Sequence, residues 1–436
     1  MVAVVNAHVK NYLLTMLNNN MPSTANNRFA ILLLTSLFFL WGFALNLNPI
    51  LIPHLKKACQ LSDVQSAFID SASYIAYFLM AIPAGQFMKR YGYKGGIILG
   101  LILFATGSFL FFPAAGSRSY AFFLGALFII ACGLAFLETA ANPYISVLGD
   151  PRTAAHRLNF AQSFNGLAAT LAPLVGGVFI LSGQSYTPEQ EASMPPEQLN
   201  SYLQNEANSV QIPFIIIGLV VLLVAIFIWK TQLPDIAEDE AVHVEKSIFK
   251  ERNLMWGVLA QFFYVGGQVC VSSFFIRFSK RVAGIEEKQA ALFLSAALLG
   301  FMAGRFIGTF LMKYIAPAKL LAAYSIINMG LLALAVVTHG KVSVYSLIGV
   351  EFFMSIMFPT IFSLSIHGLG SKTKEGSSLV IMAIAGGGVF PVIMGRLSDA
   401  TNIQTSYIVP AVCFIVVLYF ALRNLRVRDI QLTVAH

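Results

Sequence analysis

The fold is decided by residues 85–94, GQFMKRYGYK, and by a weaker copy of them at residues 308–313, GTFLMK. Each stretch ends a long apolar run, and each places a base five residues after its glycine. A second pair repeats in the same way, because residues 142–147 read NPYISV and residues 358–363 read FPTIFS. Both pairs join segments that are six apolar runs apart. The sequence therefore predicts two parallel halves of six helices each.

The composition indicates a membrane protein. The chain has 436 residues, of which 57% are hydrophobic and 11% are charged, and its mean hydropathy is +0.74. Soluble proteins carry roughly 25% charged residues, so a soluble enzyme, a disordered chain and a disulfide-built secreted scaffold are excluded. A membrane-spanning helix needs about 20 apolar residues and a connecting loop. We predict an all-α membrane protein with about twelve transmembrane helices in two pseudo-symmetric six-helix bundles.

The apolar runs place the expected helices along the chain. We predict spans at residues 29–54, 62–88, 95–114, 119–148, 156–183, 211–230, 254–278, 288–312, 319–338, 342–367, 376–397 and 406–424. Prolines inside these spans are tolerated where packed neighbours or cavity water satisfy the freed backbone groups.

Charge sets the expected orientation and the domain boundaries. Most of the 28 Lys and Arg residues fall on one side of the membrane if both termini are cytoplasmic. The net charge of +8 then reflects basic loops rather than a nucleic-acid partner. We expect a multi-pass protein of the inner (plasma) membrane, a monomer in contact with lipid. Its expected parts are an N-terminal tail (1–27), a first bundle (28–230), a cytoplasmic linker (231–252), a second bundle (253–425) and a C-terminal tail (426–436).

Neither the cysteines nor any short motif indicates an enzyme. The four cysteines are scattered and form no Cys-x-x-Cys pair, so we interpret them as small packing residues. The chain contains no metalloprotease, nucleophile-elbow or phosphate-loop motif. Gly386, Gly387 and Gly388 are expected to serve packing or a hinge. We predict no enzymatic activity and no cofactor.

Charged side chains inside a bilayer are costly and mark functional pathways. The expected spans contain Asp70, Glu138, Arg277, Arg305 and Glu351. Asp70 and Glu351 are ambiguous, because each could be neutral and protonated or paired with a base. Arg305 is expected to take part in packing and gating of the inner half.

Glu138 is the main candidate for cation coupling. Glu138 and Asn142 are four residues apart and share a helix face, and Pro143 frees a backbone carbonyl near that face. These oxygens suit a small cation such as sodium, or sugar hydroxyls. The alternative is that Glu138 pairs with an arginine of another helix for structural reasons.

Amide side chains are the candidates for substrate binding. Gln162 and Asn165 are three residues apart, and Gln261 and Gln268 are seven apart, so each pair shares a helix face. Amides donate and accept hydrogen bonds without charge, which suits a polyol. Other candidates lie in the first and seventh spans: Asn46, Asn48 and Phe262. Hydrogen bonding between helices and aromatic packing are the alternatives.

Residues 85–94 resemble the signature of the major facilitator superfamily, G-x-x-x-[DE]-R-x-G-[RK]-[RK]. The resemblance implies gating roles for four residues: Gly85, Arg90, Gly92 and Lys94. Lys89 occupies the position of the family's acid, so a gate salt bridge through that acid is in doubt. The alternative is a cytoplasmic basic cluster with Gly92 as a helix cap.

Five short stretches resemble the fucose–galactose–glucose symporter family: residues 38–42 (FFLWG), 46–48 (NLN), 137–143 (LETAANP), 161–165 (AQSFN) and 358–363 (FPTIFS). The resemblance implies twelve helices, alternating access and a central hexose site. It carries the family's helix-4 carboxylate onto Glu138 and its helix-5 polar pair onto Gln162 and Asn165.

One departure from that family bears on the coupling ion. A proton-coupled member of the family has an Asp tied to proton movement directly after the Asn-Leu-Asn run, and this chain has Pro49 there. Asp70 stands where the family has a neutral residue. We therefore expect cation-coupled symport of a neutral hexose, with sodium favoured and Glu138, Asn142, Asn48 and Asp70 as its candidate ligands. A proton-coupled symporter and an uncoupled facilitator are the alternatives.

Overall fold

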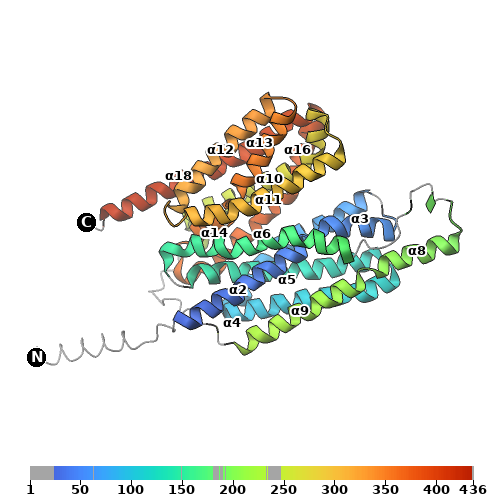
Figure 1. The fold of residues 1–436 in the computed structure, drawn as a ribbon. Helices are drawn as coiled ribbons and strands as arrows, with labels where there is room; N and C mark the ends of the chain where they lie inside the picture. Colours follow the sequence, from blue (N-terminus) through green and yellow to red (C-terminus); the bar gives the residue numbers. More distant parts are fainter. Residues whose placement is uncertain are drawn as a thin grey trace, which may run out of the picture.

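The structure is a computed structural model that describes residues 24–61, 63–148, 150–179, 186, 190–191, 193–231, 233 and 247–434. All regular elements in these residues are helices (Figure 1). We call the helices before residue 231 the first group: α2 (Thr24–Leu45), α3 (Asn48–Ala58), α4 (Asp63–Ser117), α5 (Tyr120–Val147), η1 (Pro151–Thr153), α6 (Ala154–Phe179), α8 (Pro196–Asn208) and α9 (Gln211–Lys230).

The later helices form the second group. In chain order these are η2 (Ile248–Lys250), α10 (Arg252–Ala283), α11 (Glu287–Leu311), α12 (Pro317–Val337), α13 (Lys341–Met354), α14 (Met357–Ile366), η3 (Gly370–Lys372), α15 (Thr373–Met382), η4 (Ala383–Ala385), α16 (Gly386–Ala400), α17 (Ile403–Ser406) and α18 (Ile408–Val434).

The helices agree with the twelve expected spans. Nine helical segments of the described residues are long and apolar enough to cross a membrane, and Leu32–Leu45 is a shorter apolar helix. One of the nine, Ala72–Ser117, covers two expected spans. The fifth expected span corresponds to α6. The arrangement is therefore consistent with twelve crossings.

Each helix group has its own apolar core. One core contains large side chains of the first group such as Trp41 and Phe111, and the other contains side chains of the second group such as Phe275 and Phe414. Residues of α14 and α15, among them Phe362, also belong to the first core. Figure 1 shows the second group packed along one side of the first.

Gly92 joins two antiparallel halves of α4. Its φ is 69° and its ψ is 176°, a conformation that strains any residue with a Cβ. The next turn is anchored by Lys94, whose Nζ donates hydrogen bonds to the carbonyl oxygens of Trp229 (2.8 Å) and Thr231 (2.9 Å). These contacts fix the turn against the end of α9.

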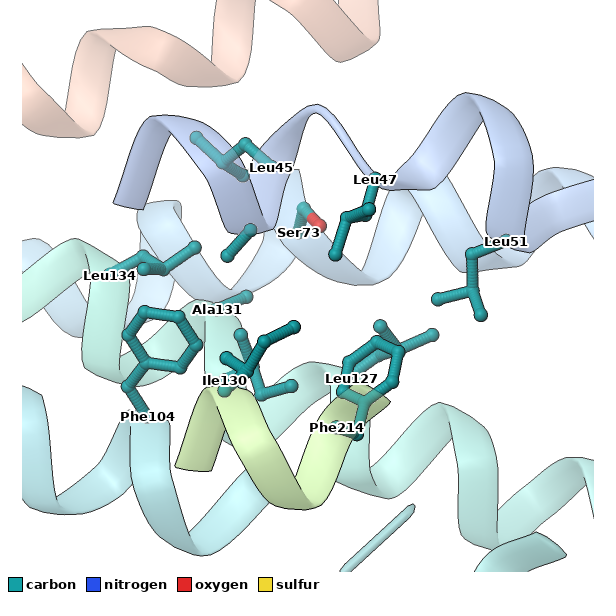
Figure 2. Close-up of a pocket in the computed structure, with 12 residues that line it drawn as sticks. Leu45, Leu47, Leu51, Ser73, Phe104, Leu127, Ile130, Ala131, Leu134 and Phe214 are labelled. Carbon is teal, nitrogen blue, oxygen red and sulfur yellow. The ribbon is translucent and has the colours of Figure 1, made fainter. Parts of the chain in front are cut away.

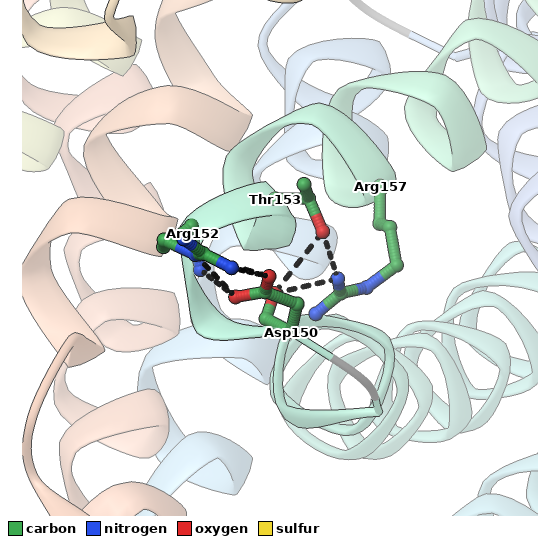
Figure 3. A network of polar contacts seen from close by, with 4 residues as sticks. All are labelled: Asp150, Arg152, Thr153 and Arg157. Atoms are coloured by element: carbon green, nitrogen blue, oxygen red, sulfur yellow. Dashed lines mark hydrogen bonds and ion pairs between the residues drawn. The ribbon is translucent and has the colours of Figure 1, made fainter.

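A compact polar turn connects α5 to α6 (Figure 3). The Asp150 carboxylate accepts hydrogen bonds from the Arg152 backbone amide (2.8 Å) and guanidinium (2.9 Å), and these bonds lower the pKa of Asp150. Arg157 donates to the carbonyl oxygens of Ile145 (3.1 Å) and Ser146 (2.7 Å). It thereby satisfies carbonyl groups that the end of α5 leaves unpaired.

The helices depart from the expected spans in three places. The first span is broken at residues 46–47 and restarts with Pro49 in the first turn of α3, because a proline lacks the amide hydrogen that a continuous helix needs. The segment between the fifth and sixth expected spans contains a helix, α8, which begins at a proline and buries Leu203 and Ala207 on one side. Helix α18 continues to Val434, through the segment expected to be a tail.

Candidate functional site

A cavity of about 480 Å³ lies between the two helix groups. The first group contributes polar side chains from the break after α2 and from α4, α5 and α6: Asn46, Tyr77, Glu138, Gln162 and Asn165. The second group contributes polar side chains from α10, α11 and α13: Gln268, Ser272, Arg305 and Glu351. Trp41 and Phe301 add aromatic surface. A polar cavity of this size inside an apolar helix bundle is suited to a small, neutral, hydroxyl-rich molecule.

Glu138 is buried in the wall of this cavity, with 5% of its surface exposed. The Tyr77 hydroxyl donates a hydrogen bond of 2.6 Å to its Oε1. Among the described residues, the other carboxylate oxygen has no hydrogen-bond partner, and no base lies within ion-pair distance of Glu138. The arginine pairing considered for this residue is therefore not observed.

Asn142 lies one turn further along α5 and is fully buried outside the cavity wall. Its Oδ1 accepts a hydrogen bond of 3.4 Å from Nε2 of Gln162. The described residues contain no group of three or more His, Cys, Asp or Glu side chains that could hold a metal ion. Asn142 thus orients Gln162, and its oxygen is not directed to a shared site with Glu138.

Asn165 is positioned by a close approach of α2 to α6. A Cβ built on Gly42 would lie 2.6 Å from Nδ2 of Asn165 and 2.9 Å from its Cα. Only a glycine leaves room for this amide, so Gly42 is a positioning residue that the search for polar side chains did not identify. Asn46, directly after the end of α2, also lines the cavity and donates a hydrogen bond of 2.7 Å to the Gly42 carbonyl.

Arg305 connects the two groups at the cavity. Its Nε donates to the Ser355 carbonyl and its Nη1 to the Gln162 carbonyl, each at 2.8 Å. The guanidinium also lies over the Phe301 ring, 4.7 Å from the centroid. The bond to Gln162 must break if the groups separate there, and the expected gating role of Arg305 stays a prediction.

Glu351 is the second buried carboxylate of the cavity, with 1% of its surface exposed. The Ser272 hydroxyl donates a hydrogen bond of 2.6 Å to its Oε1. Each helix group thus places one acid in the same cavity, and each acid is held by one hydroxyl.

Besides Asn142, four candidate residues do not line the cavity or have side chains outside the described ones. Gln261 is fully buried, and neither of its amide atoms has a hydrogen-bond partner. Phe262 packs against Phe390 with a centroid distance of 5.5 Å. Seven residues along a helix correspond to about 10 Å. Gln261 and Gln268 share a helix face, but only Gln268 reaches the cavity, and Gln261 lies among packed side chains. The side chains of Asn48 and Asp70 lie outside those that the structure describes.

Apart from Arg305, the expected gating residues lie at one end of the helices, which we call the Lys89 end. Lys89 forms an ion pair with Glu375 of α15. A Cβ at Gly85 would overlap the Ser378 side chain. Arg90 instead lies over the ring of Tyr91, 5.3 Å from its centroid. The two groups therefore do form an ion pair here, with the base on α4 and the acid on α15.

Further contacts join the groups at the Lys89 end. The Ser377 hydroxyl donates a hydrogen bond of 2.9 Å to the Thr139 carbonyl. Nδ2 of Asn159 donates a hydrogen bond of 3.2 Å to the Thr360 hydroxyl. At the opposite end, which we call the His54 end, Nε2 of His54 lies 2.8 Å from the Glu206 carbonyl oxygen, within the first group.

A second, much smaller pocket lies behind the break between α2 and α3 (Figure 2). Its volume is about 20 Å³, and its wall is apolar except for Ser73. The space holds about one water molecule. It therefore allows the helix break to pack without offering a substrate site.

Comparison with known proteins places the fold in a family. The family model described as Major Facilitator Superfamily matches residues 32–390. The chain belongs to the Major Facilitator Superfamily. It is a multi-pass membrane transporter and not an enzyme.

Individual members of the superfamily are similar over most of the chain. The glucose/galactose transporter of Brucella abortus biovar 1 (strain 9-941) is 42% identical over 411 residues, covering 93% of this chain and 96% of the relative. The L-fucose-proton symporter of Escherichia coli (strain K12) is 44% identical over 400 residues, covering 89% and 91%.

The solved structures agree with this placement. A crystal structure of the transporter FucP in the outward conformation superposes with a TM-score of 0.85 at 43% identity, covering 92% of this chain and 99% of that chain. The expected all-α fold of the superfamily is thus confirmed.

Proposed function

We propose that the chain is a proton-coupled symporter for a neutral hexose of the glucose, galactose or fucose class. The E. coli relative is named a proton symporter for L-fucose, and the Brucella relative a transporter of glucose and galactose. The observation that carries the proposal is Glu138, a buried carboxyl in the cavity wall that is held by Tyr77 and lacks a basic partner among the described residues.

The surroundings of Glu138 suit a proton better than a sodium ion. From the sequence we had favoured sodium. A hard cation needs several oxygen ligands around one point. Here Asn142 is turned to Gln162, and Tyr77 occupies one oxygen of Glu138. A proton needs only one carboxylate oxygen. The proton-coupled alternative is therefore the better interpretation of this site, and the named E. coli relative favours it too.

Burial supplies the coupling. A carboxylate shielded from water and without a counter-ion is strongly disfavoured, so Glu138 must carry a proton while the cavity is closed. Hydration of the cavity on the other side releases that proton. Proton binding then favours the state that binds sugar, through its differential affinity for the two states.

Four amides are proposed to bind the sugar: Asn46, Gln162, Asn165 and Gln268. They line one cavity from both helix groups, so a bound hexose would pull the groups together. Gln162 links sugar and proton binding, because its backbone is bonded to Arg305 and its side chain to Asn142 near Glu138.

We further propose an outward-facing state in the inner membrane, with both termini in the cytoplasm. The Lys89 end is closed by contacts between the groups, and its bases fit the cytoplasmic side. The similarity to a crystal structure in the outward conformation supports the same state.

Uptake of labelled hexose into proteoliposomes tests the function. We expect an inwardly directed proton gradient to drive accumulation of the hexose in the absence of sodium. A sodium gradient at constant pH should have no effect on accumulation. Glu138→Gln should lose accumulation but retain sugar exchange. Accumulation driven by a sodium gradient alone would refute proton coupling. Equilibration of the sugar without accumulation would indicate a facilitator.

A further inference from the structure

We propose that Glu351 is a second proton-coupling site, so that two protons move with each sugar. The inference rests on the proposed proton-coupled function. It assigns one coupling acid to each helix group, Glu138 to the first and Glu351 to the second.

The surroundings of the two acids are alike. Both line the same cavity, and both are at most 5% exposed. Each accepts one short hydrogen bond of 2.6 Å from a hydroxyl of another helix in its own group, Tyr77 for Glu138 and Ser272 for Glu351. The second oxygen of Glu351, like that of Glu138, has no hydrogen-bond partner in the described part of the chain.

No cation compensates Glu351 within ion-pair distance, as far as the described side chains show. The helices packed around it present three tyrosines and two arginines, of which Arg277 lies over the Phe274 ring, 4.1 Å from its centroid. Tyr264 donates to the Met354 carbonyl at 3.0 Å, Tyr407 donates to the Val271 carbonyl at 3.4 Å, and Tyr324 packs edge-on against Phe353. Arg305 is engaged by two backbone carbonyl groups.

These surroundings require Glu351 to exchange a proton during transport. A buried carboxylate with only one hydroxyl donor is costly, so the group is neutral while shielded. Alternating access exposes the cavity to each side in turn. Glu351 would then take up a proton from the external solution, keep it through occlusion and release it to the cytoplasm. A purely structural role would be met equally well by a glutamine, which can also accept a hydrogen bond from Ser272.

The steady-state accumulation of sugar measures the number of coupled protons. With the membrane potential clamped at zero, each coupled proton supports about tenfold accumulation per unit of pH difference. At one unit, we expect roughly hundredfold accumulation by the wild type and roughly tenfold by Glu351→Gln. Glu351→Asp, which keeps a titratable group, should remain near the wild-type value. Glu286→Gln makes the same chemical change at an exposed acid outside the cavity wall, so it is the matched control and should also remain there.

The possible outcomes separate this inference from the proposed function. Tenfold accumulation by the wild type, or equal accumulation by the wild type and Glu351→Gln, would overturn the second site while leaving proton symport intact. A Glu351→Gln protein that no longer exchanges sugar would reveal a role in folding or sugar binding and would also overturn it. A wild type that does not respond to the pH gradient would refute the proposed function itself.

Discussion

The two ends of the helices differ in which parts of the molecule they join. At the Lys89 end the groups contact each other through the Lys89–Glu375 ion pair and the hydrogen bond from Ser377 to Thr139. At the His54 end, the bond between His54 and Glu206 stays within the first group. Figure 1 shows α14 of the second group close to the first group, whereas α3 and α8 extend along the first group alone.

The difference indicates how the transporter can switch. The polar contacts that join the groups at the Lys89 end are single hydrogen bonds and one partly exposed ion pair, each worth about 1 kcal/mol or less. Apolar packing adds to them, because residues of α14 and α15 such as Phe362 belong to the first core. The polar part amounts to a few kcal/mol, which proton and sugar binding can offset. The Lys89 end therefore stays closed only while all of these contacts between the groups are made.

The largest effect is expected from filling the close contact at the Lys89 end. Gly85→Val would overlap Ser378 and meet the Lys374 carbonyl, which lies 3.2 Å from a Cβ at this position. Overpacking costs about 1–3 kcal/mol, so we expect the initial rate of sugar uptake to fall by up to about a hundredfold. Gly125→Val is the control, since a Cβ there meets nothing within 4 Å. Equal rates for the two variants would show that the contact does not govern closure.

A smaller effect is expected where Arg305 bridges the groups. Arg305→Met keeps the contact with Phe301 and removes the donors to the Ser355 and Gln162 carbonyls. Hydrogen bonds of charged groups contribute about 1.5–3 kcal/mol, so sugar affinity should weaken roughly tenfold or more. The fluorescence of Trp41 in the cavity wall reports binding. An unchanged dissociation constant would contradict the bridge, and partial recovery in Arg305→Lys would support it.

The Lys89–Glu375 ion pair should contribute less. Its side chains are 47% and 35% exposed, so solvent and salt screen the pair to at most about 1 kcal/mol. Lys89→Ala should change the uptake rate by no more than about fivefold, and the double exchange Lys89→Glu/Glu375→Lys should restore it. Arg90→Ala is the matched control, because this neighbouring base lies over Tyr91 of its own helix. An effect of Lys89→Ala that persists in 1 M salt would argue against a screened pair.

The smallest effect is expected at the turn between α5 and α6. Arg152 lowers the pKa of Asp150 by hydrogen bonding, so the carboxylate stabilises the folded state above the unfolded-state pKa. That contribution disappears as the pH falls below about 4. Asp150→Asn retains a capping oxygen and should show a slightly smaller loss of Tm between pH 6 and pH 3.5 in detergent. An identical loss in both proteins would contradict the assignment.

Much of the site could be predicted because polar groups inside apolar spans are conspicuous. Glu138, Gln162 and Asn165 stand out in this way, and the structure places all three in the cavity wall. The partners Tyr77 and Ser272 were not identified, because hydroxyl groups in apolar helices give no distinct signal. Gln261 was placed in the site because it shares a helix face with Gln268, but a shared face does not show where along the helix the cavity ends.

The sequence by itself determined the membrane class, the all-α fold and the acids that lie inside the apolar spans. These properties are local, since apolar length and the cost of a charge in a bilayer depend on only one segment at a time. Only the tertiary structure decided that Lys89 meets Glu375, that Arg305 reaches Gln162 and that Gln261 is packed away from the cavity. Such contacts join residues far apart in the chain, and the crossing of the helices, rather than any one segment, brings them together.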